Sequence, residues 1–138
     1  MNTELIQLSF DKIMQTRTYT VIVLGAHEKK FAIYTDPSIG RTLQIYLTDA
    51  EKVRPLTHDL MNHIFKGLNV KILLVVINDV QDTTYFARLF LEQDSPTLRH
   101  IIEIDARPSD CITLALMNNV PVYCTQEVLD KVIPIDET

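Results

Sequence analysis

Two stretches of the sequence, Arg54-Pro55-Leu56-Thr57-His58-Asp59 and Arg107-Pro108-Ser109-Asp110, repeat one pattern. Each opens with Arg-Pro, continues with a hydroxyl residue and an Asp, and then runs into an apolar stretch. Proline fits the first turn of a helix because its missing N–H would have no partner there anyway. An Asp in that turn favours the positive end of the helix dipole. Both stretches therefore predict the start of a helix with an arginine beside it.

The two arginines allow two interpretations. An arginine next to a helix N-terminus can bind an oxyanion, so Arg54 and Arg107 are predicted phosphate-binding residues. Equally, each arginine can form an ordinary pair with the carboxylate of its own block, Asp59 or Asp110. The repeated pattern itself is explained either by an old duplication of a strand–turn–helix unit or by chance.

The composition limits the classes of function. The chain has 138 residues, of which 46% are hydrophobic, and this is enough for one domain, residues 1–138, with a sizeable core. The net charge of −5 provides no overall basic field to attract nucleic acid. Any phosphate-binding surface must therefore be local, or must borrow positive charge from a metal ion. The N-terminus lacks the features of a signal peptide and no apolar run is long enough for a membrane helix, so we expect a cytoplasmic protein.

The pattern of apolar and turn-forming residues predicts an α+β domain with mixed or antiparallel strands and a few short helices. A turn is predicted at residues 36–40, a hairpin turn at 79–82 and a loop at 94–97. The predicted helices cover residues 57–65, with Gly67 as the stop, then 108–118, and a last one capped by Thr125 and ending near 132. The predicted strands are residues 4–10, 19–24, 31–34, 43–47, 71–78, 83–91, 99–105 and 121–124.

Three blocks of the chain resemble the signature of the bifunctional nuclease domain family. They are the first Arg-Pro block, the hairpin segment Thr84-Tyr85-Phe86-Ala87-Arg88-Leu89, and Ile104-Asp105-Ala106-Arg107-Pro108-Ser109-Asp110. The segment from Pro121 to Leu129 is similar to the family's closing segment, so the resemblance covers the chain from about Gly40 to its end. It implies an α+β domain, nuclease activity on DNA and RNA, and a homo-oligomer, with a dimer favoured. It carries over no verified catalytic residues.

The chain departs from the family in front of the first Arg-Pro block. Family members have a glycine and a full helix of small residues there, whereas residues 43–47 are followed only by Thr48-Asp49-Ala50-Glu51-Lys52. We therefore expect this helix to be cut short.

Phosphodiester hydrolysis needs an activated water and positive charge on the phosphoryl oxygens. In an acidic protein, Mg²⁺ or Mn²⁺ held by carboxylates is the usual source of that charge. The candidate metal ligands are Asp59, Glu103, Asp105 and Asp110, and the candidate catalytic residues are Asp110, Asp105 and His58. Glu103 and Asp105 are two residues apart on a predicted strand, so they point to the same face.

Each candidate also has a structural interpretation. Asp59 and Asp110 can be helix-terminal carboxylates, Glu103 and Asp105 a solvated strand face, and His58 a structural histidine. Three glycines exclude a dinucleotide-binding fingerprint and a P-loop. Tyr and Phe are not interleaved with Lys or Arg in the sequence, which argues against a stacking platform for single strands.

The leading function is metal-assisted phosphodiester hydrolysis on nucleic acid. The alternatives are a non-catalytic interaction or regulatory domain, and a binder of a small anionic metabolite.

Overall fold

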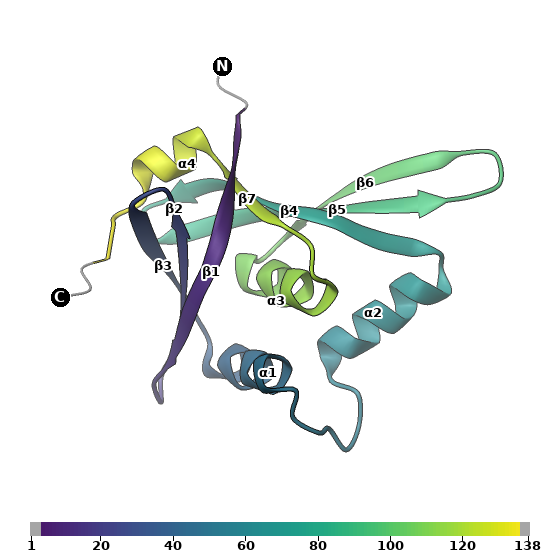
Figure 1. Cartoon of the computed structure of the whole chain (residues 1–138), viewed down its shortest axis with the longest axis horizontal. Coiled ribbons are helices and arrows are strands. Elements are labelled where there is room, and N and C mark those ends of the chain that lie inside the picture. The colour runs from purple at the N-terminus through teal and green to yellow at the C-terminus, as the bar shows by residue number, and fades with distance from the viewer. Residues whose placement is uncertain (1–3, 136–138) are drawn as a thin grey trace.

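The computed structural model describes residues 4–135 as a single curved sheet with helices on both sides (Figure 1). Seven strands are found in this part of the chain, in the order β3-β2-β1-β7-β4-β5-β6. Their bounds are β1 Leu5–Gln15, β2 Thr20–Ala26, β3 Lys29–Thr35, β4 Val70–Gln81, β5 Thr84–Asp94, β6 Arg99–Ala106 and β7 Val122–Thr125. The helices of the same part are α1 Pro37–Thr48, α2 Thr57–Gly67, α3 Pro108–Asn118 and α4 Gln126–Lys131. The expected α+β class is confirmed.

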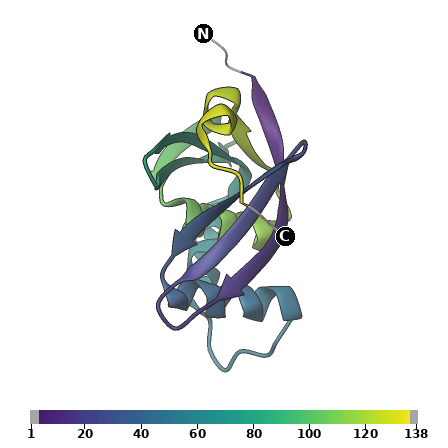
Figure 2. The same ribbon diagram turned by 90° about the vertical axis from the view of Figure 1, so that its left-hand side faces the viewer.

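Neighbouring strands are antiparallel except at the centre, where β7 runs parallel to β4. Strands β1 to β3 cross the direction of β4 to β6 steeply (Figures 1 and 2). This curvature brings β3 close to the β4–β5 turn, where the Phe31 ring stacks on Tyr85 at 5.7 Å. The C-terminal segment also contacts β3, because the Ile135 N–H donates to the Lys30 carbonyl at 2.9 Å.

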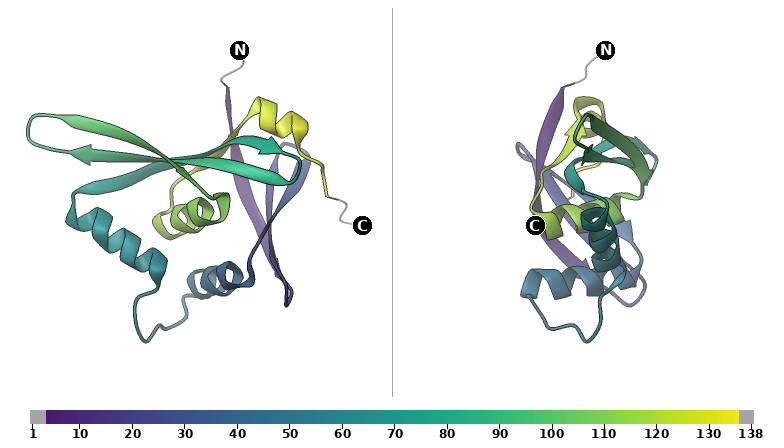
Figure 3. Two further views of the ribbon diagram at one scale, coloured as in Figure 1. Left: turned by 180° about the vertical axis from the view of Figure 1, so that it is seen from behind. Right: turned by 90° about the vertical axis from the view of Figure 1, so that its right-hand side faces the viewer.

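Helices α1, α2 and α3 lie on one side of β4 and β5, and α4 lies on the other (Figures 1 and 3). Helix α3 is the centre of the core, because residues 111–115 are all buried. Its short run of apolar residues therefore fits a helix that is covered nearly all round. None of the helices among residues 4–135 combines the length and the hydrophobicity that crossing a membrane requires.

Three sequence predictions in front of the first Arg-Pro block are wrong. Residues 36–40 begin helix α1 instead of forming a turn, since Asp36 accepts hydrogen bonds from the N–H groups of Ser38 and Ile39 and Pro37 is the first helical residue. Residues 43–47, predicted as a strand, lie inside this helix, where Leu43 is completely buried. The helix is 12 residues long, so the expectation of a shortened helix here is also wrong.

Other element boundaries differ by a few residues. Helix α2 continues through Gly67, and the left-handed residue that follows is Asn69, with φ of 60°. Strand β4 runs on to Gln81, so the hairpin turn predicted at 79–82 is confined to Asp82 and Thr83. Thr125 caps the last helix as predicted, accepting the Val128 N–H at 3.2 Å.

The start of α2 depends on Asp59. The residue before the helix is Leu56, which has no side-chain acceptor, and the Asp59 carboxylate accepts the Leu56 N–H at 2.8 Å. The same carboxylate pairs with the Lys52 ammonium at 2.9 Å. Burial works to raise the pKa of Asp59, but the Lys52 ammonium and the Leu56 N–H outweigh it and hold that pKa below its ordinary value.

Gly40 is the glycine at which an added side chain would collide with neighbouring atoms. A Cβ there would lie 1.7 Å from the Gln15 amide oxygen and 2.4 Å from the Thr20 hydroxyl, which is itself buried. We expect Gly40→Ala to lower the free energy of unfolding by about 1–3 kcal/mol through overpacking. Gly67→Ala is the matched control, because no atom lies within 4 Å of its added methyl, and it should stabilise α2 by up to about 1 kcal/mol. Denaturant unfolding of both variants tests this, and a Gly40→Ala protein as stable as the original contradicts it.

A second prediction concerns the pH dependence of stability. At pH 7, Asp59→Asn should lower the free energy of unfolding by about 1 kcal/mol, because it removes a charge-assisted contact at a helix start. Since the pKa of Asp59 is lowered by folding, this contribution is present above the unfolded-state pKa of about 3.9. It is lost as the pH falls through the lower folded-state pKa. Thermal unfolding of both proteins from pH 7 downward should therefore show converging curves, with the exposed Glu51→Gln as control. A constant difference across this range contradicts the assignment.

Candidate functional site

The two Arg-Pro blocks meet in the fold through one hydrogen bond. His58, the second residue of α2, lies with Nε2 at 3.0 Å from Oδ1 of Asp110, in the first turn of α3. The two residues are 52 positions apart in the sequence. The starts of α2 and α3 are therefore fixed to each other.

A third helix start joins this pair through Arg107. The Arg107 Nε donates to Oδ2 of Asp110 at 2.9 Å, and its Nη1 lies 3.7 Å from Oδ2 of Asp36, the cap of α1. The resulting chain of contacts, His58–Asp110–Arg107–Asp36, is called the helix-start centre below. It connects the first residues of α1, α2 and α3, which lie on the same side of the sheet (Figure 3).

The exposure of the side chains changes steadily across the helix-start centre. The His58 side chain is 6% exposed, that of Asp110 is 23% exposed and that of Arg107 is 63% exposed. The buried imidazole of His58 therefore contacts Asp110 on its interior side, and the guanidinium of Arg107 contacts it on its solvent side. A carboxylate has room for about four hydrogen bonds, so Asp110 can still accept from a water or a ligand.

The charges of the helix-start centre are set by these contacts. Hydrogen bonding to Asp110, and the charges of Asp110 and Asp36, raise the pKa of Arg107 further above its already high value. The hydrogen bond from the Ser38 hydroxyl lowers the pKa of Asp36. Two backbone N–H groups and the charge of Arg107 lower it further, whereas desolvation of the carboxylate works to raise it. At neutral pH the exposed end of the centre is therefore an ionised arginine beside an ionised carboxylate.

An open hollow lies directly at the exposed end. It is lined by Asp36, Arg107 and Ser109 from the helix starts, and by Tyr34, Thr83 and Tyr85 from the sheet. The hollow gives an anionic ligand access to the Arg107 guanidinium.

The other predicted site residues lie elsewhere or have partners of their own. Arg54 lines a different hollow, together with Lys52, Asp59 and His63. Asp59 is occupied by Lys52 and by the start of α2. The structure therefore brings His58, Asp110 and Arg107 together, and it does not bring Arg54 into the same hollow.

Glu103 and Asp105 are exposed on β6, where they stand opposite Phe90 and Arg88 of β5. Asp105 is close enough to α3 to act on Cys111. Burial, with the charges of Asp110 and Asp105, raises the pKa of the Cys111 thiol to about 12. Cys111 is therefore a neutral thiol at physiological pH and no nucleophile.

Among residues 4–135, no three His, Cys, Asp or Glu side chains come together as a metal site. The four carboxylates predicted as ligands thus do not form one cluster, and the Arg107 guanidinium lies between Asp36 and Asp110. What these residues offer a divalent ion is one or two carboxylates, which is the number Mg²⁺ commonly uses when substrate phosphates complete its shell.

Sequence reasoning missed Asp36, Tyr34 and Tyr85. A signal for Asp36 was present, because Asp36-Pro37-Ser38 follows the same order of Pro and hydroxyl residue as Arg107-Pro108-Ser109. No local signal marked the two tyrosines, which reach the hollow only because the sheet curls.

Comparison with known proteins identifies the family of this chain and two of its relatives. The model of a family described as "Bifunctional nuclease domain" matches residues 22–135, a range that includes the whole helix-start centre. Two relatives, the uncharacterized proteins MT1877 and Rv1829 from two strains of Mycobacterium tuberculosis, are each 30% identical over 120 residues. The match covers 86% of this chain and 69% of each relative. The chain belongs to the bifunctional nuclease domain family.

Proposed function

We propose that this protein hydrolyses phosphodiester bonds in DNA or RNA, with a Mg²⁺ or Mn²⁺ ion assisting, at the helix-start centre. Membership of the family supports a nuclease-related function. The observation that carries the proposal is the 3.0 Å bond from buried His58 to Asp110. It orients a partly exposed carboxylate beside an exposed guanidinium, and an oriented base next to an anion-binding group is what hydrolysis of a phosphodiester requires.

The proposed roles follow from exposure. Asp110 accepts a proton from the attacking water, whose oxygen forms a bond to phosphorus while the bond to the leaving oxygen breaks. The leaving oxygen departs with that electron pair and takes a proton from solvent water, and Asp110 releases its own proton to solvent. Arg107 binds phosphoryl oxygens and stabilises the charge that develops on them. His58 is a positioning residue, because its ring is buried behind Asp110. We propose Asp105 as a second carboxylate of this site, which is supported by the effect of its charge on Cys111 near the start of α3.

The divalent ion is proposed from the charge balance of the chain. With a net charge of −5, the protein supplies little positive charge of its own to a polyanion. A bound ion would add Lewis-acid stabilisation of the phosphoryl oxygens. Asp110 would be its protein ligand, and the phosphate and waters would complete its shell.

A non-catalytic interaction or regulatory domain is the second candidate. It is favoured by the completeness of the helix-start centre, in which Asp110 has both its oxygens bonded and Arg107 contacts two carboxylates. Such a network suffices to hold three helices together without any chemistry.

We also propose a cytoplasmic location and a homodimer. Both cysteines are free thiols, which is usual in a reducing compartment. The dimer is supported by exposed apolar surface: Ile101, Ile102 and Ile104 on the edge strand β6 are 53%, 36% and 38% exposed. A long apolar edge strand with unpaired backbone groups is a surface that proteins normally cover. Helix α2 and its C-cap residue add an exposed stripe at a spacing of four residues, Leu60, Ile64 and Leu68.

The charges on β6 complement those of a second copy. If two β6 strands pair antiparallel about a twofold axis at Ile102, Arg99, which also pairs with Glu92 of its own subunit at 2.8 Å, stands opposite Asp105 of the partner subunit on the same face. Oppositely charged cross-strand pairs stabilise such a ladder. We therefore propose that the β6 edge is the centre of the dimer interface.

The function is tested by Asp110→Asn. The variant keeps the size and a hydrogen-bonding oxygen, so we expect a loss of stability of about 1–2 kcal/mol and a loss of turnover of at least 100-fold. Labelled single-stranded and duplex DNA and RNA are incubated with each protein in Mg²⁺, Mn²⁺ or EDTA, and Glu51→Gln serves as control. Wild-type activity that is undiminished in EDTA contradicts the metal, and full activity per folded molecule of Asp110→Asn contradicts the catalytic role.

The dimer is tested by Ile101→Glu. In the proposed register this places a new carboxylate opposite Glu103 of the partner subunit, and like charges directly opposite are destabilising. Light scattering after size exclusion should show a dimer for the wild type and a monomer with unchanged circular dichroism for the variant. Val53→Glu is the control, because Val53 is fully exposed on a loop away from β6. A monomeric wild type, or a dimeric Ile101→Glu, rules this interface out.

A further inference from the structure

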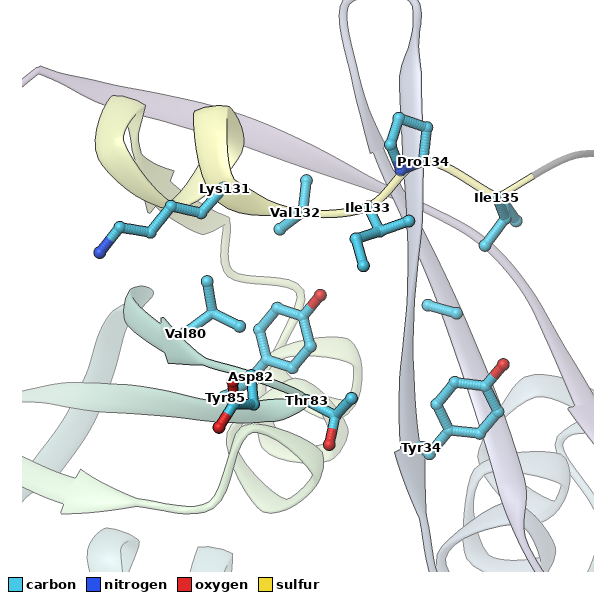
Figure 4. A pocket seen from close by; sticks show the side chains of 11 residues that line it. Tyr34, Val80, Asp82, Thr83, Tyr85, Lys131, Val132, Ile133, Pro134 and Ile135 are labelled. Atoms are coloured by element: carbon cyan, nitrogen blue, oxygen red, sulfur yellow. The ribbon is translucent and has the colours of Figure 1, made fainter.

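A second hollow adjoins the one at Arg107, and Figure 4 shows the side chains that line this second hollow. It lies between β3, the β4–β5 turn and the C-terminal segment from Lys131 to Ile135. The two hollows share Tyr34, Thr83 and Tyr85 as lining residues. They are therefore neighbours, and together they are called the tyrosine groove below, with Arg107 at one end and Lys131 at the other.

We propose that the tyrosine groove binds single-stranded nucleic acid, with a base stacked on Tyr34 and backbone phosphates held by Arg107 and Lys131. This inference rests on the proposed function, because the Arg107 end of the groove is the proposed hydrolytic centre. It adds the form of the substrate and the path by which the strand reaches that centre.

The aromatic rings of the groove are suited to a base. Tyr34 is 63% exposed on the edge strand β3, and its ring meets that of Tyr19 edge to face, with centroids 5.4 Å apart. Tyr85 is fixed by stacking on Phe31. In Figure 4 the ring of Tyr85 rises toward the C-terminal segment, and Tyr34 and Lys131 lie at opposite ends of the hollow. Stacking on such rings tolerates any base, because every base has a π-face.

The two cations mark the ends of the groove. The side chain of Arg107 is 63% exposed and that of Lys131 is 48% exposed. Lys131 pairs with Glu127 at 3.2 Å and with Asp79 at 3.9 Å. Exposed pairs of this kind contribute little, so a phosphate can replace them at small cost.

The middle of the groove favours bases over phosphates. Asp82 lines it together with the Thr83 hydroxyl, and a carboxylate repels a phosphate but accepts hydrogen bonds from base amino groups. This arrangement also selects single strands. In a duplex the base faces are covered by their neighbours, so Tyr34 can stack only on an unpaired base.

The experiment measures binding of a fluorescein-labelled ten-nucleotide single strand, and of a hairpin duplex of the same composition, by fluorescence anisotropy of the full chain. We expect the single strand to bind more tightly than the duplex. Tyr34→Ala should weaken single-strand binding by roughly 5- to 150-fold, whereas Tyr34→Phe, which keeps the ring, should retain it.

The salt dependence tests the phosphate contact. Lys131→Ala should reduce the slope of log affinity against log salt concentration by about 0.7, the value for one phosphate contact to a single strand. Lys66→Ala is the matched control, because Lys66 is also an exposed lysine in the last turn of its helix but lines hollows on β4. It should leave the slope unchanged.

Three results overturn the inference: no measurable single-strand binding, equal binding of the duplex, or a Tyr34→Ala variant that binds as the wild type does. Gel analysis of the same samples separates this failure from that of the proposed function. Cleavage by wild type with binding that is independent of Tyr34 removes the groove and keeps the hydrolysis. Binding that depends on Tyr34 without any cleavage does the reverse.

Discussion

The hydrogen bond from His58 to Asp110 is the interaction on which the helical side of the fold depends. It is made by a buried imidazole, and a buried polar group left without its partner costs about 1–3 kcal/mol. Through Asp110 the same bond orients Arg107, and through Arg107 it reaches Asp36 at the start of α1. The first turns of α1 and α2, which follow one another in the chain, are thereby held to that of the distant α3.

This constraint explains how an acidic chain can offer a site to phosphate. Arg107 has the most exposed side chain of the helix-start centre. Asp110 lies on the interior side of its guanidinium, and Asp36 lies beside it. A polyanion approaching the hollow therefore meets the arginine, while the centre as a whole keeps the negative charge that could hold a divalent ion. The net charge of the chain describes its overall field, and the site depends on how a few charges are ordered from interior to surface.

The sequence predicted the parts of the fold that depend on local chemistry. Pro108 and the carboxylates Asp59 and Asp110 are signals that act within one turn, so the starts of α2 and α3 were found. The turn predicted at residues 36–40 is wrong because Asp-Pro-Ser fits a turn as well as a helix cap. The burial of Leu43 in the core favours the helix. The contacts of Asp110 with His58 and of Arg107 with Asp36 join residues that are far apart in the sequence, and local patterns carry no information on them. The same holds for Tyr34 and Tyr85, which the curl of the sheet brings to one groove.

The central claim is that His58 and Asp110 act as one unit, and a double-mutant cycle tests it most directly. The free energy of unfolding is measured for the wild type, His58→Phe, Asp110→Ala and the double variant, because neither replacement side chain can make the hydrogen bond. We predict that the two substitutions are non-additive, with a coupling energy of about 1–3 kcal/mol, as is found for residues in direct contact. Additivity within about 0.5 kcal/mol would mean that the helix starts are held by other contacts, and would contradict the account.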